Sequence, residues 1–132
     1  MQMDMWSVGC IIAELRTGRP LFPGSDHMDH LNKMCALLGK PDADCLASIS
    51  SPWAAAYVDS LPDTPPVDLA AQFPEMSPEM VDLLGHLLTW DPAPRYTAKQ
   101  AIMHPFFAGV HDLTDEVPPS LLPPFPPPIP PA

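Results

Sequence analysis

Hydrophobic residues recur mostly at helical spacing along this 132-residue chain, and no segment shows the strict alternation that is typical of a strand. The first predicted helix covers about residues 5–16, with Asp4 as its N-cap and Gly18 as the residue that ends it. Its apolar residues lie on all sides, which predicts a helix that is buried on every face. They are Met5, Trp6, Val8, Cys10, Ile11, Ile12, Ala13 and Leu15.

A second helix is predicted from about residue 26 to 38, with Ser25 as its N-cap and Gly39 as its stop. One face of this helix is apolar and carries Met28, Leu31, Cys35 and Leu38. The pattern is weaker from 41 to 74. It predicts only short helices near 43–49 and 53–61, separated by turns that contain proline.

Two more helices have clear start signals. Ser77 caps a helix with Pro78 at its first position, and this helix ends at Asp91-Pro92. Residues 97–100, Thr-Ala-Lys-Gln, form a capping box that opens a short helix, which stops before His104-Pro105. Apolar residues of the longer helix, Met80, Leu84, Leu87 and Leu88, form one stripe. The predicted fold class is all-α.

The last fifteen residues, 118–132, contain nine of the 21 prolines. Such a segment can neither pair in a sheet nor continue a helix, so it is predicted to be a disordered, polyproline-like tail. Residues 1–117 then form one predicted domain, which is long enough for a single hydrophobic core.

The charge distribution indicates which partners suit the chain. The net charge is −10, and the stretch between Lys40 and Arg95 holds nine acidic side chains and no Lys or Arg. No Lys or Arg follows Lys99. Binding of nucleic acid requires basic patches, so it is not expected, whereas a basic partner suits this surface.

The sequence also carries signals of cellular location. Cys10, Cys35 and Cys45 form no C-x-x-C pair, which favours reduced thiols in the cytosol or the nucleus. Cys10 and Cys35 are interpreted as core residues rather than nucleophiles. No apolar run is long enough to span a membrane, and no secretory signal is visible. We therefore expect a soluble chain in the cytoplasm, the nucleus or both.

Two sequence blocks resemble the large lobe of protein kinases, in the form that it has in mitogen-activated protein kinases. Residues 4–31, DMWSVGCIIAELRTGRPLFPGSDHMDHL, resemble the region from helix F into helix G. Residues 73–107 resemble helices H and I and include the D-P-x-x-R turn at 91–95. The weakly patterned region, about 41–72, corresponds to the insert of that family. Details such as SDHMDHL are most similar to the stress-activated branch.

This resemblance implies structural roles for four residues. Asp4 matches an aspartate whose carboxylate accepts hydrogen bonds from the catalytic loop, although an aspartate at a helix start also caps without any such role. Trp6 and Gly9 match positions that pack near the activation segment. Arg95 matches an arginine that pairs with a glutamate at the end of that segment.

The motifs for phosphoryl transfer are absent from the 132 residues. These motifs are a Gly-rich phosphate loop, a Lys–Glu pair, H-R-D-x-x-x-x-N and D-F-G, and none of the six glycines forms G-x-G-x-x-G. The family uses ATP and Mg²⁺, but no catalytic, cofactor-binding or metal-binding residue is predicted in this chain.

The resemblance also implies a docking site. Asp112, Asp115 and Glu116 match an acidic patch that binds the basic end of docking peptides from kinases, substrates or phosphatases. An acidic cluster attracts such peptides over about a Debye length, roughly 8 Å in physiological salt. Without the family match, the same cluster would be interpreted as a solvated surface turn.

Two weaker possibilities concern other ligands. Asp26, His27, Asp29 and His30 could suggest a zinc site, but a solvated helix start is favoured. The segment 118–131 could bind a domain that reads polyproline, although it lacks the Arg or Lys that such ligands usually carry.

Three hypotheses for function remain open. The chain is a truncated kinase lobe that at most docks basic peptides, or it is the back half of an active ATP-dependent Ser/Thr kinase whose front half is missing from the sequence. A gene remnant that does not accumulate as folded protein is the third. If the first helix lost its covering, its apolar residues would be exposed, and marginal stability is expected.

Overall fold

The computed structural model describes residues 2–112, 114 and 121. Helices are the only regular elements within these residues, so the predicted all-α class is confirmed. The elements are α1 (Gln2–Thr17), α2 (His27–Leu38), α3 (Ala43–Ser48), α4 (Pro52–Ser60), α5 (Leu69–Gln72), α6 (Pro78–Leu87), α7 (Ala98–Ile102) and the 3₁₀ helix η1 (Pro105–Phe107).

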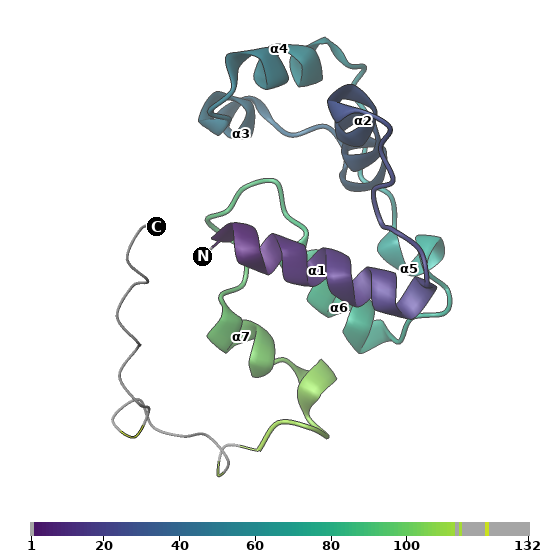
Figure 1. The fold of residues 1–132 in the computed structure, drawn as a ribbon, viewed down its shortest axis with the longest axis vertical. Coiled ribbons are helices and arrows are strands. Elements are labelled where there is room, and N and C mark those ends of the chain that lie inside the picture. The colour runs from purple at the N-terminus through teal and green to yellow at the C-terminus, as the bar shows by residue number, and fades with distance from the viewer. Residues whose placement is uncertain (1, 113, 115–120, 122–132) are drawn as a thin grey trace, which may run out of the picture.

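The helices pack around the pair formed by α1 and α6. Figure 1 shows α1 lying across α6, with α2, α3 and α4 grouped at one end of the molecule and α7 at the other. Two apolar clusters hold this arrangement together. One contains Ala13, Phe73, Met76, Leu84 and Leu88, and the other contains Met5, Leu83, Leu87 and Ala101.

Helix α1 begins three residues before the position that the sequence pattern indicated. The expected N-cap, Asp4, lies inside the first turn, where its carboxylate interacts favourably with the helix dipole. This is a correction to the predicted cap. The predicted end is confirmed, because Gly18 adopts φ +72° and its N–H donates to the carbonyl oxygen of Glu14 at 2.8 Å.

The prediction that α1 is buried on every face is wrong for the described structure. Val8, Ile11 and Leu15 are 37%, 52% and 80% exposed, while Met5 and Ala13 on the other side are buried. The reason is that α6 and the other described residues pack on one side of α1 and leave the opposite side exposed. Val8, Ile11 and Leu15 are three and four residues apart and therefore form one exposed stripe, called the α1 stripe below.

The ends of α2 and α6 differ slightly from the predictions. Asp26 caps α2 in place of Ser25, since its carboxylate accepts a hydrogen bond from the Asp29 N–H at 2.8 Å. Ser77 caps α6 as predicted, but the helix ends at Leu87, before Asp91-Pro92. Beyond the end of this helix, the carbonyl oxygen of Thr89 accepts a hydrogen bond from the Arg95 guanidinium.

The remaining elements follow local signals. The capping box at the start of α7 is complete, because the side chains of Thr97 and Gln100 each accept a hydrogen bond from the other residue's backbone N–H. Helices α3 and α4 lie where short helices were expected. Helix α5 and the 3₁₀ helix η1 were not predicted, since each has only four residues or fewer. The predicted tail, 118–132, lies outside the described residues except for Leu121.

Candidate functional site

Arg95 and Trp6 meet although they are far apart in the sequence. The Arg95 guanidinium lies 5.2 Å from the centre of the Trp6 ring and donates a hydrogen bond to the carbonyl oxygen of Thr89 at 2.6 Å. Arg95 is only 8% exposed. Burial lowers its pKa, an effect that the carboxylate of Asp91 opposes. This cation–π contact connects the start of α1 to the loop that follows α6.

Aromatic rings extend this contact in two directions. The Trp6 ring stacks on Phe22 with 6.1 Å between centroids, and it lies 6.4 Å from the ring of Trp90. The indole N–H of Trp90 donates to the carbonyl oxygen of Gly39 at 2.9 Å. Trp6 therefore joins α1, the segment after it and the end of α2 into one unit.

Gly9 and Asp4 occupy different environments on α1. Gly9 is buried against α6, where an added Cβ would lie 3.0 Å from the Cβ of Leu87 and 3.0 Å from Cδ2 of Leu88. Glycine thus lets the two helices approach closely. The Asp4 side chain is exposed on the first turn. The roles that the family resemblance implies for both residues toward the catalytic loop and activation segment stay predictions.

A histidine–carboxylate pair joins α6 to η1, and sequence analysis missed it. Nε2 of the buried His104 lies 2.8 Å from a carboxylate oxygen of Asp82, and Nδ1 accepts a hydrogen bond from the Phe106 N–H at 3.1 Å. Because Nδ1 accepts, the proton of neutral His104 lies on Nε2, which donates to Asp82. This bond lowers the pKa of Asp82. The spacing of Asp82 and His86 was the available sequence signal for a histidine–carboxylate pair. It did not indicate His104, because His104 is 22 residues away from Asp82 in the sequence.

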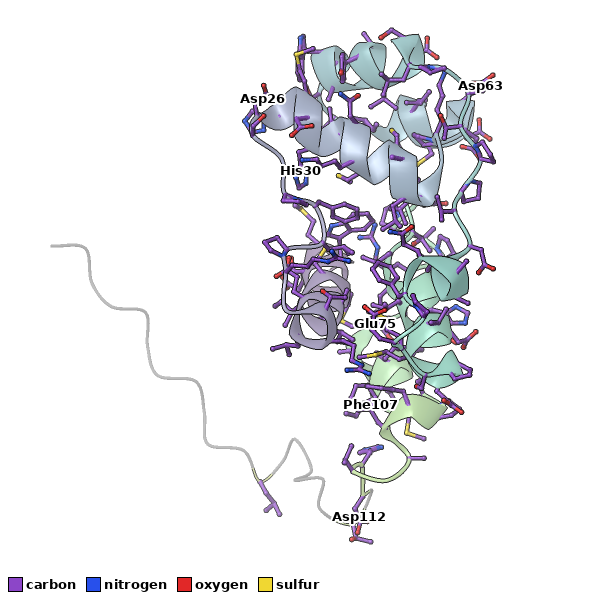
Figure 2. The ribbon with its side chains drawn as sticks, turned by 90° about the vertical axis from the view of Figure 1, so that its right-hand side faces the viewer. Asp26, His30, Asp63, Glu75, Phe107 and Asp112 are labelled. Carbon is purple, nitrogen blue, oxygen red and sulfur yellow. The ribbon has the colours of Figure 1, made fainter. Side chains whose placement is uncertain are left out.

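The acidic segment for which the family resemblance implies docking is described only in part. Asp112 is exposed, and one of its carboxylate oxygens accepts hydrogen bonds from the Thr114 N–H at 2.9 Å and the Thr114 hydroxyl at 2.7 Å. These bonds lower the pKa of Asp112, so it is ionised at neutral pH. Figure 2 shows Asp112 at the end of the described fold opposite Asp26 and Asp63. Asp115 and Glu116 lie outside the described residues.

Three of the four residues considered for zinc have other partners. Asp26 caps α2, and Asp29 accepts from the Ser25 N–H and pairs with Lys33 at 2.9 Å. The His30 ring meets the Phe22 ring edge-on at 5.9 Å between centroids. Within residues 2–112, 114 and 121, no three His, Cys, Asp or Glu side chains converge as a metal-binding group.

The cysteines pack as predicted. Cys35 is buried, and Cys10 is half-buried against the cluster that contains Leu84. Burial, helped by the nearby carboxylate of Glu14, raises the pKa of Cys10 to about 11. A thiol with such a pKa is a poor nucleophile at neutral pH.

In the part of the chain that the structure describes, no helix combines the length and the apolar character that are needed to cross a membrane.

Comparison with known proteins identifies the class to which this fold belongs. The protein kinase domain family matches residues 1–107. The chain therefore belongs to the protein kinase family.

The individual relatives are mitogen-activated protein kinases. The chain is 45% identical over 122 residues to spk1 of Schizosaccharomyces pombe, a match that covers 92% of this chain and 33% of that protein. It is 46% identical over 114 residues to pmk-1 of Caenorhabditis elegans, covering 86% and 30% of the two chains. It is 44% identical over 116 residues to HOG1 of Torulaspora delbrueckii, covering 88% and 27%.

These matches confirm the resemblance to the C-terminal part of a mitogen-activated protein kinase of the stress-activated branch. The chain spans about a third of the length of these relatives. It is accordingly similar to one part of a Ser/Thr kinase whose family uses ATP and Mg²⁺.

Proposed function

We propose that this chain is a docking module of the mitogen-activated protein kinase type, which binds basic peptides and does not transfer phosphate by itself. The observation that supports docking is the exposed, ionised Asp112 at the end of the fold, in a chain with no Lys or Arg after Lys99. The absence of the phosphate-binding and catalytic motifs from the sequence supports the second half of the proposal. We place this activity in the cytoplasm or the nucleus.

The physical basis of docking is a local excess of negative charge. Asp112, Asp115 and Glu116 lie within five residues, and His111 is the nearest group that can become positive. Lys and Arg side chains of a peptide would be attracted to these carboxylates and would form exposed ion pairs. Because exposed pairs are weak and screened by salt, we expect low affinity that falls as ionic strength rises.

The test is a titration of the purified 132-residue chain with a fluorescent peptide that has a Lys/Arg-rich end. We expect saturable, salt-sensitive binding, and Asp112→Asn should weaken it roughly two- to fivefold, as loss of one exposed ion pair does. Asp44→Asn is the matched control, because Asp44 is exposed on α3 and carries the same charge. Equal weakening by both substitutions would show that only net charge matters and would contradict the docking site.

The same preparation tests catalysis. With ATP, Mg²⁺ and a basic protein substrate, phosphate transfer should not exceed that of a buffer control. Phosphate transfer that persists after repurification of the chain would overturn this half of the proposal.

The α1 stripe favours a second candidate function, in which the chain completes an active kinase. Leu15 is 80% exposed and Ile11 52%, and exposed apolar stripes of this kind mark contact surfaces. In this alternative, the stripe packs against the remaining part of a kinase domain, and phosphate transfer requires both parts.

This alternative is tested by complementation. The chain is mixed with the part of a related mitogen-activated protein kinase that precedes the matched region, and phosphate transfer is measured with ATP and Mg²⁺. Leu15→Asp should abolish any gain in activity, whereas Val110→Asp, at a residue that is 81% exposed outside the stripe, should not. No gain with the unchanged chain would reject the alternative.

A further inference from the structure

A cavity of about 400 Å³ opens between the end of α1, α2 and residues 67–73. This volume lies in the range of small-molecule sites in proteins, roughly 300–1,000 Å³. Most of the lining residues are apolar, and two of them are cationic. The residues that define it are Arg19, Leu21, Lys33, Leu37, Val67 and Phe73.

The walls of the cavity are held in place by bonds between separate segments. The Val67 N–H donates to the carbonyl oxygen of Leu37 at 3.0 Å, which fixes residues 67–73 against α2. On the opposite side, the Lys33 ammonium donates to the carbonyl oxygen of Pro23. Phe73, another lining residue, is 5% exposed and belongs to the apolar cluster that contains Leu84. The cavity is therefore formed before any ligand arrives.

The charged residues that line the cavity, Arg19 and Lys33, are positive in an otherwise acidic chain. Lys33 is compensated by Asp29 at 2.9 Å, so it adds little net charge. The Arg19 guanidinium forms no hydrogen bond or ion pair with any other described residue. The carboxylate of nearby Glu14 already accepts a hydrogen bond from the Leu21 N–H at 3.2 Å. A planar guanidinium in this situation suits a carboxylate, which it can bind through two parallel hydrogen bonds.

We propose that this cavity binds a small amphipathic carboxylate. The apolar part of the ligand lies against Leu21, Leu37 and Phe73, and its carboxylate accepts hydrogen bonds from Arg19. This site goes beyond peptide docking, since it shares no residue with the segment 111–116.

The probe for this site is decanoate, titrated into the ¹⁵N-labelled chain and followed by NMR. Residues 19–23, 36–37 and 67–73 should shift and saturate together. Decanol, which lacks the carboxylate, should bind roughly tenfold more weakly because a charge-assisted hydrogen bond is lost. Equal binding of decanoate and decanol, or shifts centred on the α1 stripe, would overturn the proposal.

Three variants make the test specific. Arg19→Gln should weaken decanoate roughly tenfold and leave decanol unchanged. Lys99→Gln removes the charge of an exposed residue on α7, outside the cavity, and is the matched control. It should bind decanoate like the unchanged chain. Ala36→Trp, at an exposed residue of the cavity wall, should fill the space and abolish binding of both probes. Equal effects of Arg19→Gln and Lys99→Gln would reject the role of Arg19, and undiminished binding to Ala36→Trp would reject the cavity.

Discussion

Replacing Gly9 by alanine tests how closely α1 packs on α6. An added Cβ would lie 3.0 Å from the Cβ of Leu87, an atom attached directly to the α6 backbone. The contact can be relieved only if the two helices move apart. Gly85 is the matched control, since it lies in α6, is exposed, and has nothing within 4 Å of an added Cβ.

The two substitutions share one gain and differ in one cost. Alanine is favoured over glycine inside a helix by about 1 kcal/mol, so Gly85→Ala should stabilise the chain by about that amount. Overpacking of a well-packed interface costs about 1–3 kcal/mol, so Gly9→Ala should leave stability unchanged or lower it by up to about 2 kcal/mol. The free energies of unfolding of the two variants should therefore differ by about 1–3 kcal/mol.

The assay is urea unfolding followed by circular dichroism at equal protein concentration. With a slope of about 1–3 kcal/mol per molar urea, the difference between the variants is a shift of roughly 1 M in the midpoint. Equal stabilisation by Gly9→Ala and Gly85→Ala would refute the close contact between α1 and α6.

Three other predictions follow from buried or paired groups. In a variant that keeps Cys10 as its only cysteine, reaction with a thiol reagent at pH 8 should be roughly a hundredfold slower in the folded chain than in urea. The reason is that the pKa of about 11 for folded Cys10 leaves little thiolate. Equal rates would contradict the burial of Cys10. The pKa of Asp82 is lowered in the fold, so its stabilising pair with His104 is fully present above the ordinary value of 3.8 and is lost as the pH falls through the lower value. The urea midpoints of the unchanged chain and of Asp82→Asn should thus differ above about pH 4 and converge in stronger acid. A difference that stays constant with pH would contradict the stabilising role of ionised Asp82. Arg95→Lys should lower the free energy of unfolding in urea by about 1–3 kcal/mol, because lysine cannot reproduce the guanidinium contacts with Thr89 and Trp6. An unchanged urea midpoint would show that these contacts contribute nothing to stability.

Local sequence signals predicted the starts of α6 and α7 correctly, whereas the predicted cap of α1, Asp4, lies inside the helix. Ser77 and the Thr97–Gln100 capping box lie at the expected helix starts, because these side chains bond to backbone groups three residues away. The cap of α2 was displaced by one residue, since Ser25 and Asp26 are both good caps. Helix α5 is too short for any periodic pattern to indicate it.

The contacts of the candidate site could not be predicted from spacing alone. Trp6 and Arg95 are brought together by the packing of α1 on α6, and Asp82 meets His104 because η1 folds back onto α6. The exposure of the α1 stripe was also unexpected from the pattern, which indicates only that a helix is apolar and not which neighbours cover it. The prediction that Asp112 is a docking residue came from the family resemblance. Charge alone would not distinguish the acidic segment around Asp112 from an ordinary surface turn.

The most direct test of the central claim is a residue-resolved NMR titration of the ¹⁵N-labelled chain with the Lys/Arg-rich peptide at low and physiological salt. The proposed docking function predicts saturable shifts of Asp112 and Thr114 that weaken as salt is added and shrink in Asp112→Asn. It would be contradicted if the peptide produced no saturable shifts, or if the shifts lay on α2 and α4 at the opposite end of the fold.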